Sequence, residues 1–365
     1  MQSKILYNGD KMKISTCIIA KNEEEVVERI LKCVAKFSDE IIFVDTGSRD
    51  KTLNIAQKYT EKIYQFKWQN DFSMARNFAF SKATCEYLAW FDADDIITDQ
   101  NCNEILKIKQ IKNPSDTYMF KYLCGFTSED KPSLTFYRER LMRNCAYAKF
   151  VGAVHEVVIP FGKTEYLAVE VEHRKIKSGN SKRNLKIYNK ISKEQPLCSR
   201  DMYYYAKEYY YNGYYKSAIK LLNKYLKASG GYAPDIKDAY LTLYGCAISL
   251  NLKNPLKYLL KCLEFCALDG EVLCKLGDEF YRLKDYKKSI DFYKIALSID
   301  CTQIKFGFVR QEYYYVYPLL QLVKTCYQIG WVDQALFFHK KCLERYPCDE
   351  RVVYNTIFFE KVGLK

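Results

Sequence analysis

The first half of the chain alternates short apolar runs with segments whose apolar positions repeat every three or four residues. Runs rich in β-branched and aromatic residues predict strands at 14–20, 40–45, 62–66 and 86–91. Helical spacing predicts a helix that begins at Asn22, one that follows Gly47-Ser48, and one over 72–82. Strands that alternate with helices at these lengths predict a mostly parallel sheet covered on both faces.

After about residue 115 the pattern changes. Residues 117–124, 133–142, 154–159 and 165–171 read as shorter strands without helices between them, which predicts an antiparallel extension of the sheet. The next segment, 173–193, contains eight Lys or Arg residues and no acid. It is either a basic helix with a loop or a linker between domains.

From about residue 199 the chain is helical and repetitive. Leu276-Gly277 and Phe280, followed by Tyr293 and Ala296, show the small and large alternation of a tetratricopeptide repeat (TPR). Related frames run through 206–225 and 326–347, with a weaker copy at 244–263 and an insert near 301–315. We therefore expect stacked helical hairpins, and a division into a leader (1–11), an α/β domain (12–175), a basic segment (176–198) and a helical domain (199–365).

Composition limits the class of protein. The chain has 365 residues, 48% of them hydrophobic and 28% charged, which is typical of a globular protein with two domains. No apolar run approaches the ~18 residues that span a bilayer, and the N-terminus lacks the apolar core of a secretory signal, so we expect a cytoplasmic protein. Fifteen cysteines without a C-x-x-C pair indicate a reduced compartment. Residues 1–170 are electrically neutral, so the whole net charge of +13 lies in the rest of the chain and favours anionic partners.

Polar side chains gather where the predicted parallel strands end, at 20–23, 45–48 and 92–95. In open α/β sheets, ligands bind beyond these carboxyl ends. Asp92 and Asp94 are two positions apart, so both can face one point, where a hard divalent cation such as Mg²⁺ or Mn²⁺ would relieve their repulsion. Taken alone, this acidic stretch is also what a solvated turn looks like.

Four segments occur in one order: Ile-Ile-Ala-Lys-Asn-Glu-Glu, Val-Asp-Thr-Gly-Ser-Arg-Asp-Lys-Thr, Phe-Ser-Met-Ala-Arg-Asn-Phe-Ala and Trp-Phe-Asp-Ala-Asp-Asp. Together with Arg140-Leu-Met-Arg143, Gly-Ala-Val-His-Glu156 and His173, this order resembles family 2 glycosyltransferases, in particular bacterial members with a TPR-like C-terminal domain that modify bacteriocin peptides on Cys or Ser. The resemblance implies a GT-A fold, that is, a Rossmann-like, mostly parallel sheet with an antiparallel extension, followed by an all-α TPR-like domain.

The resemblance also implies roles for single residues. Asp45 would accept a hydrogen bond from the nucleobase of a UDP-sugar, and Arg76 would lie near the nucleotide. Asp92 and Asp94 would form the DxD motif that holds Mn²⁺ or Mg²⁺ on the diphosphate, with His155 and His173 as further metal ligands. The resemblance also places Ala20, Glu23 and Ala93 beside the nucleotide. For an inverting transfer, Glu156 and Asp95 are the candidate bases, with Glu156 preferred.

Each of these residues also has a structural reading. Asp45 or Ser48 would cap the following helix, Arg76 would pair with an acid such as Asp71, and Glu23 would be a first-turn residue favoured by the helix dipole. Each of the two histidines is also explained as a buried, hydrogen-bonded imidazole. After His173, the aromatic residue and glycine that usually follow in this motif are replaced by Arg-Lys-Ile. Lys177, Lys182 and Arg183 form either a loop that closes over the diphosphate or, preferably, a solvated linker.

Three functions compete at this point. The first is an inverting, metal-dependent transfer of a sugar from a UDP-sugar to a peptide or protein acceptor. The second keeps the transfer but uses a lipid-linked or cell-surface glycan, with the basic half in peripheral contact with an anionic membrane. The third is a helical-repeat interaction protein with a vestigial catalytic domain. No nucleic-acid partner is expected, and the surface tyrosines of the helical half are compatible with a homodimer.

Overall fold

The computed structural model describes residues 11–176, 182–228, 231–266 and 268–364. The chain divides into two compact units: unit 1 contains residues 1–125 and 136–196, and unit 2 contains residues 126–135 and 197–365. The change near residue 197 lies close to the expected start of the helical domain. The turn segment 126–135 belongs to unit 2, although the sequence places it inside the α/β domain.

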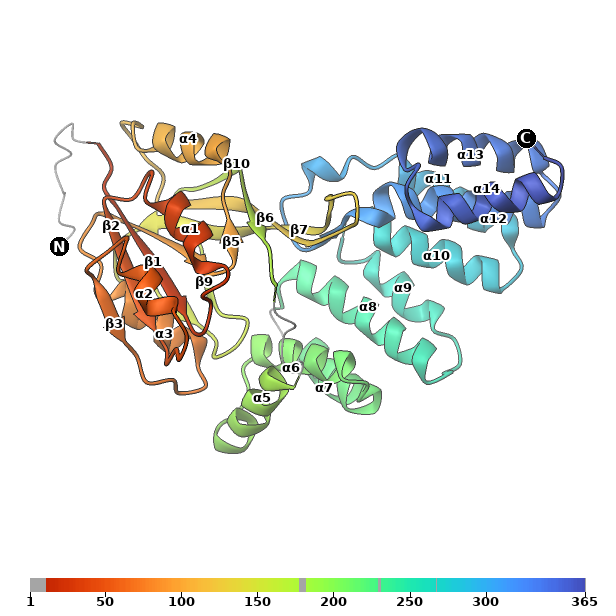
Figure 1. Cartoon of the computed structure of the whole chain (residues 1–365). Helices are drawn as coiled ribbons and strands as arrows, with labels where there is room; N and C mark the ends of the chain where they lie inside the picture. The colour runs from red at the N-terminus through yellow and green to blue at the C-terminus, as the bar shows by residue number, and fades with distance from the viewer. Residues whose placement is uncertain (1–10, 177–181, 229–230, 267, 365) are drawn as a thin grey trace. The chain divides into compact units, whose positions relative to one another are not determined.

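Unit 1 begins with the alternation that the hydrophobic pattern predicts (Figure 1). Its first elements are β1 (Ile14–Ala20), α1 (Val27–Val34), β2 (Glu40–Asp45), α2 (Thr52–Ala56), β3 (Ile63–Gln65), α3 (Phe72–Phe80) and β4 (Tyr87–Asp92). β1 lies between β2 and β4 and is parallel to both, and β2 is parallel to β3. The parallel core of the expected fold is therefore confirmed.

Both faces of this sheet are buried, and alternate residues of one strand serve different cores. In β4, Tyr87, Ala89 and Phe91 pack into the cluster that includes α1 and the helix α4 (Asp99–Ile108). Leu88 and Trp90 pack into a second cluster with α3 on the opposite face. This two-residue period is the geometry of an extended strand, and it explains why β4 reads as a continuous apolar run.

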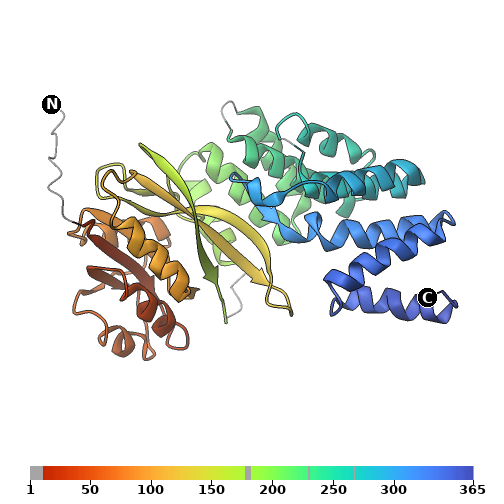
Figure 2. The ribbon, with the colours of Figure 1, turned by 90° about the horizontal axis from the view of Figure 1, so that it is seen from above.

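The rest of unit 1 consists of β5 (Asp95–Ile96), α4, β6 (Thr117–Phe126), β7 (Pro132–Arg143), β8 (Phe150–Val151), β9 (Val157–Val158), β10 (Thr164–His173) and α5 (Arg183–Glu194). Among the described residues, the main sheet has the strand order β3-β2-β1-β4-β7-β6-β10-β5, with β11 (Val309–Arg310) added to β7. The strands β6, β7 and β10 are visible as long yellow to yellow-green arrows in Figure 2.

One expectation for this region, that its strands are shorter, is wrong, whereas the expected antiparallel extension is confirmed for β7 and β5. β6, β7 and β10 have 10, 12 and 10 residues and are longer than β1, which has 7. β7 is antiparallel to β4, and β5 is antiparallel to β10, but β10 is parallel to β6. The residues between β7 and β10 form only the small β8–β9 pair beside the sheet, so the chain re-enters the sheet in the direction of β6.

Unit 2 contains helices joined mostly by short loops. They are α6 (Ser199–Tyr211), α7 (Tyr215–Lys227), α8 (Ala233–Ser249), α9 (Leu256–Cys262), α10 (Gly270–Arg282), α11 (Tyr286–Leu297), α12 (Val316–Gln328), α13 (Val332–Arg345) and α14 (Glu350–Lys361). Gly277 in α10 shows why small residues recur here, because a Cβ at this position would lie 2.5 Å from the ring of the buried Tyr293 in α11. The expected helical hairpins are confirmed.

The insert between α11 and α12 is ordered by its own contacts within unit 2. It contains two short 3₁₀ turns, Cys301–Gln303 and Gln311–Tyr314, on either side of β11. β11 pairs with Leu134 and Thr135 of β7. The guanidinium group of Arg310 pairs with Glu271 and also lies 3.7 Å from Asp238 Oδ1. The insert therefore joins the turn segment to the buried charges of the helical hairpins.

No disulfide forms among the fifteen cysteines of the chain, all of which are free thiols. Among the described residues, no helix combines the length and the apolar character that a membrane crossing requires.

Candidate functional site

The carboxyl ends of three neighbouring parallel strands meet at one edge of the sheet in unit 1. Ala20 of β1 is in register with Asp45 of β2, and Ile19 is in register with Asp92 of β4. Because parallel strands end at the same edge, the polar residues that follow them gather there, as the sequence predicts.

The loops after β1 and β2 are tied together by hydrogen bonds. The amide of Asn22 donates to Ser48 Oγ at 2.9 Å, and the amide of Glu23 donates to Thr52 Oγ1 at 2.7 Å. Asn22 has a positive φ of 56°, a conformation that asparagine tolerates better than most residues. These bonds hold residues 22–24 outside the helix, so α1 begins at Val27 and not at the expected Asn22.

Asp45 is buried, with 1% of its surface exposed, and its carboxylate closes the turn after β2. It accepts hydrogen bonds from the amides of Gly47, at 3.0 Å, and of Ser48, at 3.1 Å. The alternative that Asp45 or Ser48 caps the next helix is wrong, because Lys51 is the N-cap residue of α2 and Asp50 accepts the bond from the Thr52 amide. The turn presents Asp45 at the same edge as Asp92.

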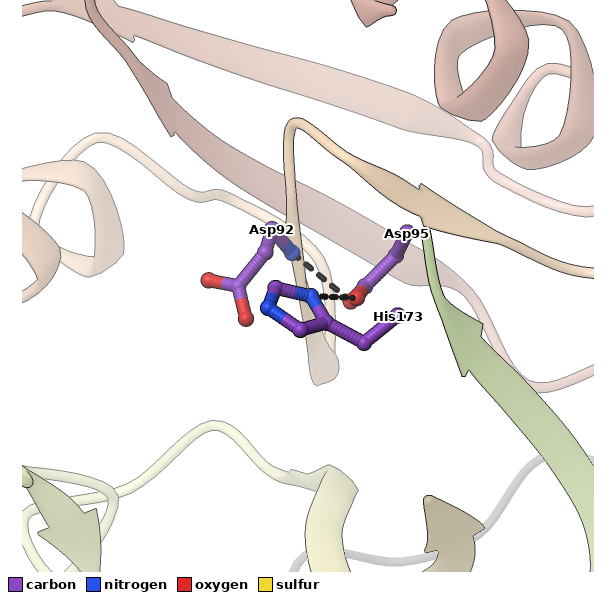
Figure 3. A group of neighbouring side chains, drawn as sticks. All are labelled: Asp92, Asp95 and His173. Atoms are coloured by element: carbon purple, nitrogen blue, oxygen red, sulfur yellow. Dashed lines mark hydrogen bonds and ion pairs between the residues drawn. The ribbon is translucent and has the colours of Figure 1, made fainter. Parts of the chain in front are cut away.

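Three side chains from three strands converge beyond the end of β4 (Figure 3). They are Asp92 of β4, Asp95 of β5 and His173 of β10, and one potential ligand atom of each lies within 4.8 Å of the others. His173 is opposite Asp95 in the antiparallel β5–β10 pair, and its Nδ1 lies 3.3 Å from Asp95 Oδ1 and 3.2 Å from Asp94 Oδ1. The pairing of β5 with β10 therefore brings His173, 78 residues away in sequence, to the acidic motif.

Asp95 is the anchor of this cluster and is completely buried. Its Oδ2 accepts a hydrogen bond from the Asp92 amide at 2.9 Å and lies 3.3 Å from Arg140 Nη2. Its Oδ1 accepts a hydrogen bond from the Tyr122 hydroxyl at 2.6 Å and faces His173. Both oxygens are thus already engaged by the protein.

Arginines balance the negative charge of the acidic motif. Arg76 Nη2 lies 2.5 Å from Asp92 Oδ1, and Arg76 Nε lies 2.7 Å from Glu156 Oε1. The guanidinium groups of Arg76 and Arg140 lie over the ring of Trp90, 4.4 and 3.8 Å from its centroid, and this cation–π contact helps to compensate their burial. The alternative prediction that Arg76 pairs with Asp71 is wrong. The Asp71 carboxylate instead caps α3 by accepting a hydrogen bond from the Met74 amide.

The charges around this cluster shift two pKa values. Burial alone would raise the pKa of Asp92, but the charges of Arg76, Arg140 and His173 lower it below its usual range. Burial alone would lower the pKa of His173, but its hydrogen bonds to Asp94 and Asp95 raise it to about 9. Without a bound cation, His173 is therefore protonated at neutral pH and supplies part of the balancing charge.

The donor set suits a divalent cation. Two carboxylates and an imidazole are oxygen and nitrogen ligands that Mn²⁺ accepts. Asp95 has no exposed side-chain surface, so it is better suited to orient His173 through Nδ1, which leaves Nε2 for a cation. The side chains of Asp92 and Asp94 are 27% and 17% exposed, so they are better placed to provide oxygens. His155 does not belong to the converging group found in the described part of the chain. It lies in a tight turn with a φ of 52°, immediately before Glu156.

The remaining predicted residues lie near this edge in different ways. Ala20 and Ala93 are buried, so their backbone alone can contribute to a binding surface, and the Ala20 carbonyl already accepts a hydrogen bond from Thr46. Lys177 lies outside the described residues. Arg183 is the first residue of α5, so this part of the basic segment is a helix. Its guanidinium group lies 4.8 Å from the Phe72 ring centroid.

Sequence reasoning assigned no role to Tyr122, Arg138 or Arg140. Arg138 and Arg140 are two residues apart on β7 and reach the same ring, Trp90. Arg140 is fully buried, and Arg138 Nη2 donates to the Glu156 carbonyl at 3.0 Å. The signal in the sequence was Arg-Glu-Arg at alternate positions of a predicted strand, which places two cations on one face.

Comparison with known proteins agrees with this description of unit 1. Residues 15–153 match the sequence model of "Glycosyl transferase family 2". A TPR repeat-containing protein of Synechococcus elongatus is 33% identical over 146 residues, which are 40% of this chain and 35% of that protein. The SPbeta prophage-derived glycosyltransferase SunS of Bacillus subtilis is 27% identical over 232 residues, 59% of this chain and 54% of SunS.

The chain thus spans about a third to a half of these two curated relatives. Among solved structures, residues 1–349 of TarS from S. aureus in complex with UDP-GlcNAc align with a TM-score of 0.41 and 16% identity, over 66% of this chain and 89% of that chain. The matched region, 15–153, includes the ends of β1, β2 and β4 and the Asp92–Asp95 motif. Residues 15–153 of unit 1 therefore match the glycosyl transferase family 2 model, and the helical hairpins of unit 2 follow them in the sequence.

Proposed function

We propose that this protein is an inverting, metal-dependent glycosyltransferase that transfers a sugar from a UDP-sugar to a peptide or protein acceptor. The observation that carries the proposal is the convergence of Asp92, Asp95 and His173, with Asp94 Oδ1 3.2 Å from His173 Nδ1. This group lies at the sheet edge where Asp45 also lies. This edge lies within a family 2 domain, whose members transfer sugars.

Asp92, Asp94 and His173 Nε2 would hold Mn²⁺ or Mg²⁺, and Asp95 would orient His173. The bound cation would supply positive charge to the leaving diphosphate. Arg76 and Arg140 are held by the same acidic motif, so they keep its carboxylates ionised before the donor binds. Asp45 would accept a hydrogen bond from the nucleobase, and the loop bonds between Asn22, Ser48 and Thr52 would keep that pocket in shape.

In the transfer, an acceptor hydroxyl or thiol attacks the anomeric carbon while the bond from that carbon to the phosphate oxygen breaks. Glu156 is the proposed base that takes the acceptor proton, because part of its side chain, 12%, remains exposed. Asp95 is disfavoured as the base, because its side chain is 0% exposed and both oxygens are bonded. Arg76 fixes the position of Glu156 through the 2.7 Å contact.

The test begins with thermal unfolding of the full chain in the presence of UDP, with and without Mn²⁺. A ligand that binds only the folded state raises the melting temperature, so we expect a rise that needs both components. The Asp94→Ala variant should lose this rise, and a Glu104→Gln variant, changed on an exposed part of α4, should keep it. No rise in the unmodified protein would favour the interaction protein without catalysis.

Hydrolysis of a panel of UDP-sugars by the same protein then identifies the donor. Addition of cysteine- or serine-containing peptides should divert the sugar from water to the peptide, which mass spectrometry detects as a mass increase of one hexose or N-acetylhexosamine. Transfer to lipid-linked glycans but to none of the peptides would replace the proposed acceptor with a glycan.

A further inference from the structure

The candidate base Glu156 lies outside the main sheet, in the turn that joins β8 to β9. These strands have two residues each and form a separate two-stranded sheet. Positive φ values at Gly152, of 94°, and at His155, of 52°, mark a tight turn between them. An isolated pair of short strands has little stability of its own, so the position of Glu156 depends on contacts with other elements.

The first turn of α3 provides contacts of this kind. The backbone amide of Phe72 donates a hydrogen bond to the Ala153 carbonyl at 2.9 Å. The hydroxyl of the buried Ser73 donates a hydrogen bond to the Gly152 carbonyl. Both carbonyls belong to the turn that leads to Glu156, so the beginning of α3 fixes the course of this turn.

Asn77, one helical turn further along α3, binds β8 as a neighbouring strand would. Its Nδ2 donates to the Phe150 carbonyl at 3.0 Å, and its Oδ1 accepts from the Phe150 amide at 2.8 Å. One side chain thus satisfies both backbone groups of Phe150 in place of a sheet partner. The Phe150 ring is buried, with its centroid 5.1 Å from those of Phe80 and of Trp90. The backbone and the side chain of Phe150 are therefore both fixed.

The side chains that α3 directs to segment 150–156 lie on one face of the helix. Ser73 precedes Arg76 and Asn77 by three and four positions, which places the three side chains next to one another. Arg76 Nε lies 2.7 Å from Glu156 Oε1. The helix therefore holds this segment at both ends, by its backbone at the start and by the Glu156 carboxylate at the end.

We propose that Asn77 is a positioning residue for Glu156 and acts through its two hydrogen bonds to Phe150. This inference rests on the proposed function for the role of Glu156 as the base. A base must lie within hydrogen-bond reach of the acceptor proton, and a displacement of about 1 Å costs about a hundredfold in rate. The side-chain hydrogen bonds of Asn77 go to Phe150 and, within the described residues, none goes to 92–95, so donor binding should not depend on them.

The first test measures steady-state sugar transfer by the full chain. Asn77→Ala removes both bonds to Phe150, and we expect kcat to fall about tenfold or more while the KM for the donor stays unchanged. The matched control is Asn144→Ala, which removes the exposed amide bond to the Cys85 carbonyl, far along the chain from segment 150–156. The control should retain the kcat of the unmodified protein. Full activity of Asn77→Ala would overturn the inference.

A second variant guards against a folding defect in the first. Ser73→Ala removes the separate hydroxyl bond to Gly152 and should also lower kcat without a change in the KM for the donor. Its control is Ser81→Ala, which removes a hydroxyl bond to the Phe78 carbonyl at the other end of α3 and should leave kcat unchanged. The melting temperature of each variant identifies a loss of folding. Equal kcat values for Ser73→Ala and Ser81→Ala would contradict a role of α3 in holding the turn.

A double-mutant cycle with Glu156→Gln separates positioning from a general loss of structure. Once the base is absent, its displacement has no further cost, so Asn77→Ala should lower the kcat of Glu156→Gln by less than about twofold. A residue that only stabilises the fold would lower kcat by the same factor in both backgrounds. That result would overturn the inference.

Hydrogen exchange keeps this inference apart from the proposed function. The Phe150 amide donates to Asn77, so backbone amides in peptides that cover 148–158 should exchange faster in Asn77→Ala and normally in Asn144→Ala. Unchanged exchange would show that Asn77 does not hold the segment, and the inference would fail while sugar transfer stands. If the unmodified protein transfers no sugar but exchange rises in Asn77→Ala, the proposed function fails and Asn77 remains the residue that fixes segment 150–156.

Discussion

Arg76 connects Asp92 and Glu156: its Nη2 lies 2.5 Å from Asp92 Oδ1, and its Nε lies 2.7 Å from Glu156 Oε1. One buried guanidinium group thus links the acidic motif at the end of β4 to the candidate base that follows β8. Because both carboxylates share Arg76, a change at one of them also affects the other. Variants at this site therefore need one measurement of the reaction rate and a separate measurement of folding.

Replacement of Asp94 by alanine should lower sugar transfer by about a hundredfold or more, because the charge that develops on the leaving diphosphate loses its stabilisation. The measurement is turnover of the UDP-sugar identified by the hydrolysis panel, at saturating Mn²⁺. Glu104→Gln, on the exposed face of α4, is the control and should retain full activity. An Asp94→Ala enzyme that works at full rate would exclude the proposed metal site.

Replacement of Glu156 by glutamine should lower kcat about a hundredfold or more and leave the KM for the donor nearly unchanged, because glutamine keeps the shape but cannot take a proton. Steady-state kinetics with a thiol and a hydroxyl acceptor separates the roles further. A thiol ionises more readily, so the loss should be smaller with the cysteine peptide. A rise in the KM for the donor without a loss of kcat would show that Glu156 acts only in binding.

Replacement of Asp95 by asparagine should reduce the free energy of unfolding by about 3 kcal/mol, because the fully buried Arg140 loses the nearer of its two carboxylate partners and keeps only Asp92 Oδ2, at 3.9 Å. Urea unfolding followed by tryptophan fluorescence measures this change. Glu156→Gln is the comparison. It should reduce the free energy of unfolding less, because Arg76 retains its ion pair with Asp92. If Asp95→Asn were as stable as the unmodified protein, the anchoring role of Asp95 would be wrong.

The stability of unit 2 should depend on pH through Asp238. Burial alone would raise its pKa, but the charges of Lys207 and Arg310 lower it to about 2, from the ordinary 3.8. The folded state therefore binds this proton less readily than the unfolded state, and the stabilisation is complete above pH 3.8 and is lost as the pH falls towards 2. The difference corresponds to about 2 kcal/mol.

Urea unfolding between pH 6 and pH 2.5 tests this expectation. The Asp238→Asn variant lacks the titrating group. The change in its unfolding free energy between these two pH values should therefore be smaller than in the unmodified protein by about 2 kcal/mol. Asp333→Asn, on the exposed surface of α13, should follow the unmodified protein. Parallel pH curves for Asp238→Asn and the unmodified protein would contradict the assigned pKa.

Gly277→Ala should destabilise unit 2 by about 1–3 kcal/mol, since the added Cβ would lie 2.5 Å from the ring of Tyr293, which is fully buried. An exposed helical position without a facing ring, such as Lys287→Ala in α11, should change stability little. Thermal unfolding of the two variants gives the comparison. A Gly277→Ala protein that melts at the normal temperature would argue against tight packing of α10 on α11.

The sequence predicted the elements that depend on local pattern. The strand 14–20 has the observed bounds, and the polar ends of β1, β2 and β4 were correctly placed at one edge, because parallel strands bring their carboxyl ends together. The helix α4 was missed, although Thr98 caps it and Cys102, Ile105 and Ile108 form its apolar stripe. This stripe is short, and it follows directly on the acidic motif.

The pairing of distant segments was not predictable from one sequence. The parallel register of β10 with β6, the approach of His173 to Asp95, and the burial of Arg140 under Trp90 all depend on which strands become neighbours. A run of residues shows which side chains share a face of its own strand, but not which strand lies beside it. The sequence by itself therefore determined the motif, the alternation of strands and helices, and the helical repeats. Only the tertiary structure decided which charges meet, because burial and charge compensation arise between residues that the chain keeps far apart.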